Sequence, residues 1–197
     1  AAEHVKQDLD GRIEMILDGG PASIGVESTV LDLTVDPPQI LRPGGAPYEE
    51  LLKVLGHVEI HPAVMAEKRV RIAKVPSPGM KHRHYAPRAE MVLVEGTLKA
   101  TVEKVQQIAD ACRKTGKRVG ILATDETKDG YEADVVKSLG AREDSSSMAR
   151  NLFRLLREFD EDEVDIIVAE GVPLEVYGLA VMNRLRKASG YRIVKAG

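Results

Sequence analysis

Apolar side chains near the start of the chain recur every three to four positions. This spacing predicts an amphipathic helix that ends at Gly19-Gly20-Pro21. The apolar positions of that helix are Val5, Leu9, Ile13, Ile16 and Leu17. Farther along, residues 25–34 and 39–41 have the pattern of strands separated by the turn-forming Asp36-Pro37-Pro38, and residues 48–55 predict a short helix.

The pattern changes beyond Pro87, where apolar strand-like runs alternate with helical periodicity. Strands are predicted at 91–94, 119–123, 164–169 and 191–194, helices at 99–114, 148–159 and 178–188, and a weaker helical or mixed segment at 133–139. The strands lack polar alternation, which is typical of a mostly parallel sheet covered on both faces. We therefore expect a three-layer α/β/α domain with a Rossmann-like architecture.

Between these two patterns, the sequence becomes basic and proline-bearing and loses its periodicity. Such a stretch is typical of a connection between domains. The sequence thus predicts a first α/β part over residues 1–66, a linker over 67–89 and a second α/β domain over 90–197.

The composition limits the classes of function. The 197 residues are 43% hydrophobic and carry a formal net charge of -3, which argues against broad electrostatic capture of nucleic acid or membrane. The single cysteine, Cys112, cannot form an internal disulfide and suits a reducing compartment. No apolar run is long enough for a membrane span. These features favour a cytoplasmic protein.

The linker contains the most informative stretch, Ser77-Pro78-Gly79-Met80-Lys81-His82-Arg83-His84-Tyr85-Ala86-Pro87. Its proline and glycine residues interrupt regular structure, while its cations supply donors suited to phosphate and Tyr85 supplies a ring suited to stacking. The segment has the character of a basic strap over an anion. A solvated linker is the alternative that the residues alone leave open.

Two motifs in the first part could also bind an anionic ligand. Ser28, within the strand-like 25–30, offers an uncharged hydrogen-bonding group, and Arg42 could hold a phosphate or carboxylate through two parallel hydrogen bonds. Gly44 and Gly45 would let backbone amides approach a ligand closely. By themselves, these patterns favour structural roles, because Ser-Thr in a strand is usually cross-strand packing and an arginine before Pro-Gly is usually a surface turn.

The remaining candidates favour structural roles. The pairs His57/His61 and His82/His84 have no cysteine or carboxylate cluster that would complete a metal site. Asp144, followed by three serines, is typical of a helix cap. We expect Glu170 to be solvated and residues 183–187 to form the polar face of the last helix. The chain lacks the glycine fingerprint of dinucleotide-binding enzymes, which disfavours an oxidoreductase.

In combination, segments 25–30, 41–44 and 77–87 resemble the two-domain form of the L-threonylcarbamoyladenylate synthase family, whose catalytic domain is of the YrdC type. Residues 169–171 and 178–185 also resemble the C-terminal domain of that family, so the resemblance spans nearly the whole chain. One departure is His82, where the family more often has tyrosine.

The resemblance implies a nucleotidyltransferase that makes threonylcarbamoyl-AMP and pyrophosphate from L-threonine, bicarbonate and ATP, with Mg²⁺ accompanying the ATP. It places Ser28 at the threonine site and Arg42, His84 and Tyr85 at the nucleotide. It implies no nucleophilic catalytic residue. The product would serve the threonylcarbamoyladenosine modification of tRNA, so tRNA or a tRNA-modification protein is an expected partner.

The family's catalytic domain begins with a lysine-and-arginine-bearing segment and a serine-to-asparagine motif, and neither is found in this sequence. Residues 1–66 therefore resemble the C-terminal part of that domain, and we expect the 197 residues to be inactive alone. The alternative hypothesis is a non-catalytic regulatory module that binds a nucleotide, RNA or a protein.

Overall fold

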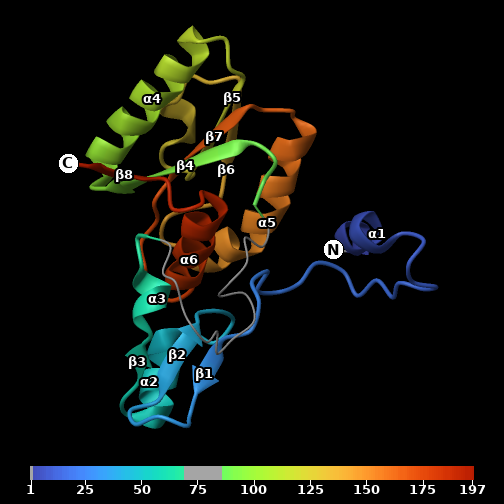
Figure 1. The fold of residues 1–197 in the computed structure, drawn as a ribbon, viewed down its shortest axis with the longest axis vertical. Coiled ribbons are helices and arrows are strands. Elements are labelled where there is room, and N and C mark those ends of the chain that lie inside the picture. Colours follow the sequence, from blue (N-terminus) through green and yellow to red (C-terminus); the bar gives the residue numbers. More distant parts are fainter. Residues whose placement is uncertain (1, 69–85) are drawn as a thin grey trace.

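The computed structural model describes residues 2–68, called the first part below, and residues 86–197, called the second part. The helices of the first part are α1 (Ala2–Leu9), α2 (Tyr48–Leu55) and α3 (Pro62–Met65). Its strands are β1 (Val30–Asp32), β2 (Gln39–Arg42) and β3 (Glu59–Ile60), of which β3, like α3, was not predicted from the sequence. Figure 1 shows these elements at one end of the molecule, with α1 set apart from the others.

The first helix is shorter than the apolar spacing predicts. It stops at Leu9, and Gly11 follows with a φ of 71°, a left-handed conformation that glycine adopts without strain. Ile13, Met15 and Leu17 then lie in irregular chain, and all three are exposed. The helical expectation for residues 10–17 was therefore wrong, because the Asp10-Gly11 turn outweighs the apolar periodicity.

A three-stranded sheet in the order β1-β2-β3 organises the rest of the first part. β1 is antiparallel to β2, with Val30 opposite Arg42, and β2 is parallel to β3. Helix α2 occupies the predicted span, and Gly56 follows it and donates its amide to Leu52 O at 2.9 Å. This sheet fixes the position of the strand end that carries Arg42.

The second part is built on five parallel strands in the order β6-β5-β7-β4-β8. The strands are β4 (Glu90–Gly96), β5 (Val119–Ala123), β6 (Val135–Ser138), β7 (Ile166–Glu170) and β8 (Ile193–Ala196). The connecting helices are α4 (Leu98–Lys114), the 3₁₀ turn η1 (Lys128–Gly130), α5 (Ser145–Glu161) and α6 (Gly178–Ala188). The mostly parallel α/β domain is confirmed.

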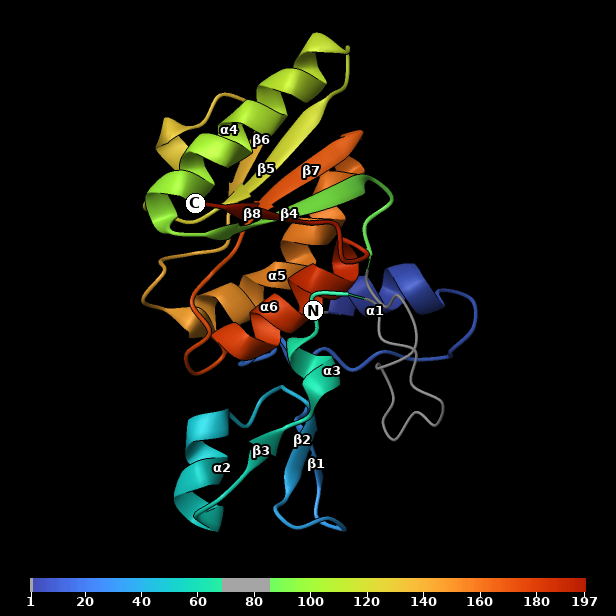
Figure 2. The same cartoon turned by 60° about the vertical axis from the view of Figure 1, so that its left-hand side comes forward.

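Neighbouring residues on the strands face opposite sides of the sheet, and both sides are covered. Leu93 and Ile167 contribute to the core under α5 and α6, whereas Val94 and Val168, one position later, contribute to the core under α4. Figures 1 and 2 show α4 on one face and α5 with α6 on the other. This is the expected three-layer sandwich, and it explains why the strands show no polar alternation.

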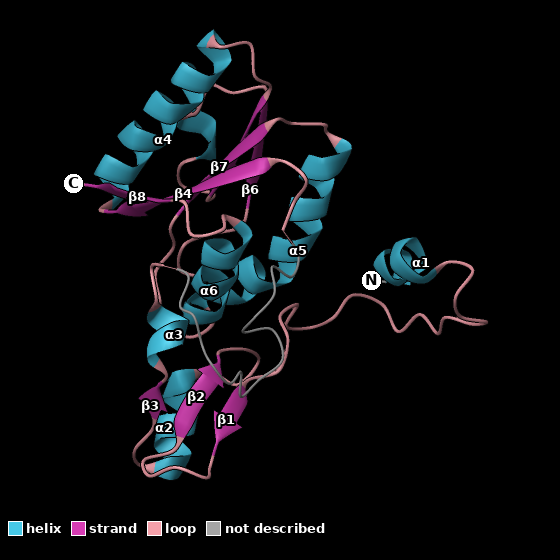
Figure 3. Ribbon diagram, viewed as in Figure 1, coloured by secondary structure: helices cyan, strands magenta, loops and turns pink. Residues whose placement is uncertain are grey.

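The weak segment at 133–139 forms strand β6 and no helix, which corrects the sequence prediction. Its residues Val135–Ser138 pair in parallel with Gly120–Ala123 of β5. Only the short η1 turn lies between β5 and β6 in the chain. Figure 3 shows β6 drawn as a strand. The free hydrogen-bonding edge of β5 therefore decides the structure of a segment whose own pattern is mixed.

Helix α5 (Ser145–Glu161) begins three residues before the predicted start at 148, and Asp144 caps it as the sequence predicts. The Asp144 side chain accepts a hydrogen bond from Ser147 N at 3.0 Å and so caps the first turn. The apolar positions of α5 are buried against the sheet, at Met148, Ala149, Leu152, Leu155, Leu156 and Phe159. Gly25 of the first part lies against the α5 backbone, since a Cβ built there would stand 2.5 Å from Arg150 Cα.

Candidate functional site

Two of the residues singled out from the sequence, Ser28 and Arg42, lie side by side at the end of the three-stranded sheet. The Arg42 guanidinium donates to the Ser28 carbonyl oxygen from Nε at 3.1 Å and from Nη2 at 2.9 Å. Arg42 binds the main chain of Ser28, and Ser28 itself is exposed. A fixed positive charge thus lies beside the main chain of an exposed serine.

The loops that carry these residues, 25–29 and 42–46, are joined by close backbone contacts. Gly45 N donates to Glu27 O at 3.0 Å, Thr29 Oγ1 donates to Ala46 O at 2.7 Å, and Ala46 N donates back to Thr29 Oγ1 at 3.0 Å. A Cβ on Gly44 would lie 2.1 Å from Glu27 O. The close approach that Gly44 allows is therefore to the chain's own backbone.

Helix α6 of the second part contacts the loops 25–29 and 42–46. Arg184 donates to Glu27 Oε2 from Nη2 at 2.6 Å and from Nε at 3.1 Å, and its Nη1 donates to Pro43 O at close range. Arg184 is buried, with 6% of its surface exposed. This ion pair fixes the loop next to Ser28 and Arg42 onto the second part.

The same helix holds the end of the first part. Asn183 Nδ2 donates to Val64 O at 3.1 Å, and Arg186 Nη1 donates to Met65 O at 3.2 Å. Arg186 also pairs with Glu95, through Nε at 2.8 Å and Nη2 at 3.0 Å. The expectation that residues 183–187 form a solvated face was wrong, because the first part covers them. Figure 2 shows α6 between the five-stranded sheet and α3.

Electrostatics keep the Glu27 carboxylate ionised. Burial raises the pKa of Glu27, but the charge and hydrogen bonds of Arg184, with a smaller contribution from Arg42, outweigh burial and leave the pKa below its ordinary value of 4.5. Among the described residues, the group around Ser28 therefore contains an ionised carboxylate and at least two arginines at neutral pH.

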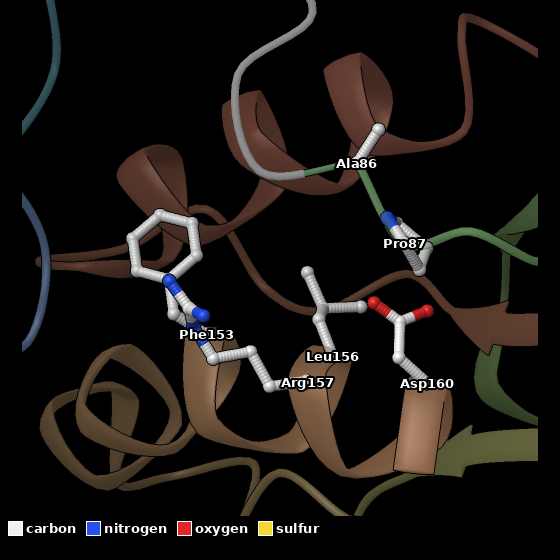
Figure 4. A pocket seen from close by; sticks show the side chains of 6 residues that line it. All are labelled: Ala86, Pro87, Phe153, Leu156, Arg157 and Asp160. Carbon is white, nitrogen blue, oxygen red and sulfur yellow. The ribbon is translucent and has the colours of Figure 1, made fainter. Parts of the chain in front are cut away.

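Two other predicted site residues, His84 and Tyr85, lie outside the described residues, as does most of the strap. Where the described chain resumes, Ala86 and buried Pro87 line a pocket of about 170 Å³ with Phe153, Leu156, Arg157 and Asp160 of α5. In Figure 4, Pro87 and Asp160 lie at one end of this pocket and Phe153 at the other. Arg157 also pairs with Asp8 of α1 at 2.7 Å.

Within residues 2–68 and 86–197, no group of three or more histidine, cysteine, aspartate or glutamate side chains could hold a metal ion, and no helix is long and apolar enough to cross a membrane. His61, considered above with His57, has a local role instead. Its Nδ1 accepts a hydrogen bond from Ala63 N at 3.1 Å at the start of α3.

Residues 47–190 match the family model described as threonylcarbamoyl-AMP synthase, C-terminal domain. The chain belongs to this family. Residues 1–44 match a second family model, described as telomere recombination. The family resemblance expected from the sequence is thereby confirmed.

Relatives in this family align with almost all of the chain. The threonylcarbamoyl-AMP synthase of Pyrococcus abyssi is 51% identical over 195 residues, covering 99% of this chain and 55% of the relative. That of Bacillus subtilis is 45% identical over 194 residues, covering 98% and 54%. The chain thus spans about half the length of the curated relatives it matches.

A solved structure supports the same assignment. The crystal structure of P. abyssi Sua5 complexed with L-threonine superposes with a TM-score of 0.88 at 49% identity, covering 98% of this chain and 54% of that one. The threonylcarbamoyl-AMP synthase family therefore accounts for the fold of both parts.

Glu170, in the family's C-terminal domain, is buried, although we expected it to be solvated. It ends β7 with 0% of its surface exposed, because η1 and the chain around Arg142 cover the carboxyl end of the sheet. The carboxylate accepts hydrogen bonds from the hydroxyl groups of Tyr131 and Thr124, and Arg142 Nη1 lies 3.6 Å away. Burial and the bond to Glu170 raise the pKa of Tyr131, so its hydroxyl stays protonated and donates.

Replacing Tyr131 with phenylalanine should lower the free energy of unfolding by about 1–3 kcal/mol, because one buried oxygen of Glu170 loses its donor. Urea denaturation followed by circular dichroism would measure this. Thr34→Val is the matched control, since its hydroxyl donates to Asp32 on an exposed surface, and it should change stability by less than about 0.5 kcal/mol. Equal effects of the two changes would contradict a buried network around Glu170.

The contact between Glu95 and α6 predicts a loss of stability in acid. Burial raises the pKa of Glu95, but hydrogen bonds from Arg186 and Lys195 and their positive charges leave it below 4.5. A carboxylate whose folded pKa is lowered contributes fully above its unfolded pKa, and the contribution disappears as the pH falls through the folded value. Between about pH 5 and about pH 3, wild-type protein should lose more stability than Glu95→Gln. Urea denaturation at several pH values would measure the free energy of unfolding of both proteins. An equal loss in the two proteins over this pH range would contradict the prediction.

Proposed function

We propose that this chain supplies part of the threonine and nucleotide site of an L-threonylcarbamoyl-AMP synthase. The reaction joins L-threonine, bicarbonate and ATP into threonylcarbamoyl-AMP and releases pyrophosphate and water. The observation that carries the proposal is the placement of Arg42 against Ser28, with 2.9 Å between Arg42 Nη2 and Ser28 O. The names of the P. abyssi and B. subtilis relatives, and the L-threonine complex of the P. abyssi protein, support this reaction class.

In this proposal, Ser28 contacts L-threonine through its hydroxyl group and Arg42 contacts the nucleotide phosphates. Arg42 has two functions, because it fixes the Ser28 main chain and places a permanent positive charge beside it. The side chains described here offer positioning and charge neutralisation, and these two effects account for much of the catalysis of phosphoryl-type transfers.

The proposed nucleotide site also includes His84 and Tyr85 of the strap. Their role rests on the sequence alone, although a solved P. abyssi structure of this family has an adjacent histidine and tyrosine replaced by alanine. In the sequence of this chain, His84-Tyr85 is the one adjacent histidine-tyrosine pair.

Magnesium would enter this reaction with ATP as part of the substrate. Mg²⁺ is commonly bound by the phosphates of a nucleotide together with one or two carboxylates, and it would neutralise part of the phosphate charge here. The threonylcarbamoyl-AMP product would then be consumed by enzymes that modify adenosine in tRNA, with tRNA or a modification protein as the partner.

ATP–pyrophosphate exchange that requires both L-threonine and bicarbonate tests the proposed reaction. The chain would be assayed alone and fused to the part of the P. abyssi protein that its match does not cover. We expect exchange in the fusion, lost when Arg42 is changed to glutamine and retained when the exposed Arg154 is changed to glutamine. A folded fusion without exchange, or one indifferent to Arg42, would refute the proposal.

A further inference from the structure

One arginine of α6 contacts both loops of the Ser28–Arg42 site, next to the two proposed ligands. Glu27 precedes Ser28 in the chain, and its Oε2 accepts from Arg184 Nη2 at 2.6 Å and from Arg184 Nε at 3.1 Å. Pro43 follows Arg42, and its carbonyl oxygen accepts from Arg184 Nη1. A single side chain of the second part therefore holds the immediate neighbour of each proposed ligand.

The Arg184 guanidinium is committed to groups of the protein itself. Each of its three nitrogens donates to Glu27 or to Pro43, and 6% of the residue is exposed. Ser28, by contrast, is exposed. Arg184 would therefore act on a bound substrate through the loops 25–29 and 42–46 and not by direct contact.

The two loops are tied to each other, so that neither can move alone. Arg42 donates to Ser28 O from Nε and from Nη2, and Gly45 N donates to Glu27 O at 3.0 Å. Gly44 packs so closely against the other loop that an added Cβ would stand 2.1 Å from Glu27 O. A shift of either loop would therefore displace Ser28 and Arg42 together.

The contact between Arg184 and Glu27 joins two ionised groups at neutral pH. Burial raises the pKa of Glu27, but the charge and hydrogen bonds of Arg184 outweigh burial and keep the pKa below its ordinary value of 4.5. Hydrogen bonds between ionised groups are about twice as strong as those between neutral groups. The charge of Arg42 also acts on this carboxylate, with a smaller effect. Without Arg184, Glu27 would compete with a substrate phosphate for Arg42.

We propose that Arg184 is a positioning residue of the threonine and nucleotide site, which holds Ser28 and Arg42 in place from the second part and so sets how tightly they bind the substrates. This inference rests on the proposed function, because that function assigns Ser28 to L-threonine and Arg42 to the nucleotide phosphates. It gives the second part a role in substrate affinity that requires no contact with the substrate.

Steady-state kinetics of the fusion described above test the inference. In ATP–pyrophosphate exchange, Arg184→Met should raise KM for L-threonine about tenfold and change kcat less, because displaced loops lose contacts made in the ground state. Arg186→Met is the matched control. Arg186 also makes a buried ion pair, with Glu95, and donates to Met65 O of the first part, but these contacts lie away from the loops 25–29 and 42–46. The control should leave KM unchanged.

A second variant guards against a failure to fold. Arg184→Lys keeps the charge but loses the planar fork that reaches both loops, so it should raise KM by a smaller factor than Arg184→Met. Thermal melts of all variants identify a temperature at which they are folded, and the kinetics are measured there.

A second readout needs no substrate. In the 197-residue chain, the Gly45 amide donates to Glu27 O, so its hydrogen–deuterium exchange reports the separation of the two loops. Arg184→Met should accelerate this amide exchange, whereas Arg186→Met should leave it at the wild-type rate. NMR spectroscopy would follow the Gly45 amide in each protein.

The outcomes separate this inference from the proposed function. A higher KM and faster Gly45 amide exchange in the Arg184 variants, but not in Arg186→Met, support it. An unchanged KM, or one raised equally by Arg186→Met, overturns the positioning role and leaves the proposed function intact, because the wild-type fusion is active. A raised KM with unchanged Gly45 amide exchange also overturns it, since the loops then do not carry the effect. An inactive wild-type fusion refutes the proposed function and this inference with it.

Discussion

Replacing Arg184 with methionine is expected to lower the free energy of unfolding by about 3 kcal/mol. The change keeps the aliphatic bulk but removes both hydrogen bonds to Glu27 Oε2 and the donor to Pro43 O. This loss is at the lower end of the range for removing one partner of a buried ion pair, because the Glu27 side chain is 33% exposed. Urea denaturation at neutral pH would measure the loss.

Arg154→Met provides the matched control. Arg154 pairs with Glu158 one turn along α5, but its side chain is 49% exposed, so we expect a cost below about 1 kcal/mol. A double change of Glu27 to glutamine and Arg184 to methionine should cost less than the sum of the single changes, since both partners then leave together. If Arg184→Met is no more destabilising than Arg154→Met, the ion pair does not join the two parts as described.

Gly44→Ala is expected to disrupt the Ser28–Arg42 site and to lower stability by about 1–3 kcal/mol or more. The added Cβ would meet Glu27 O at 2.1 Å, Ser28 C at 2.5 Å and Thr29 N at 2.6 Å, and these backbone atoms cannot rotate away. The loops would have to separate, and the hydrogen bonds between Arg42 and Ser28 would be strained. Urea melts would report the stability, and amide NMR shifts of Thr29 and Gly45 would report the loop.

Its neighbour in sequence supplies the control for this change. A Cβ on Gly45 meets only side-chain atoms of Ile24, the nearest at 3.4 Å, which is ordinary contact. Gly45→Ala should therefore leave both stability and the Thr29 resonance nearly unchanged. If the two alanine variants melt at the same urea concentration, the loops do not make the close contact described here.

The sequence predicts elements best where local pattern and tertiary environment agree. Residues 119–123 and 178–188 form a strand and a helix with the predicted bounds, because a continuous apolar run suits a strand buried on both faces and a helical apolar period suits packing on a sheet. Segment 133–139 lacks such a pattern, and its structure depends on pairing with β5. That pairing is a long-range event that the local sequence does not encode.

The polar residues of α6 illustrate a different limit. Asn183, Arg184 and Arg186 have the composition of a solvated helix face, and their partners Val64, Glu27 and Met65 lie more than a hundred positions earlier in the sequence. Nothing near residue 184 in the sequence indicates that the first part of the molecule covers it. Pairing an arginine with one particular glutamate across that separation requires the three-dimensional structure.

The candidate site, too, could be predicted only in part from the sequence. The residue types at Ser28 and Arg42 were recognisable from their motifs, but their mutual contact depends on the antiparallel register that places Val30 opposite Arg42.

The strand order has a consequence for how the protein is made on the ribosome. The two neighbours of β4 in the sheet are β7 and β8, so Leu93 stays unpaired until Ala169 and Ile193 have been synthesised. During that interval, the exiting chain exposes an apolar segment with unsatisfied main-chain groups. Such a segment is prone to aggregate and is readily bound by chaperones. Slow translation of the last third of the message would lengthen this exposure, and fast translation would shorten it.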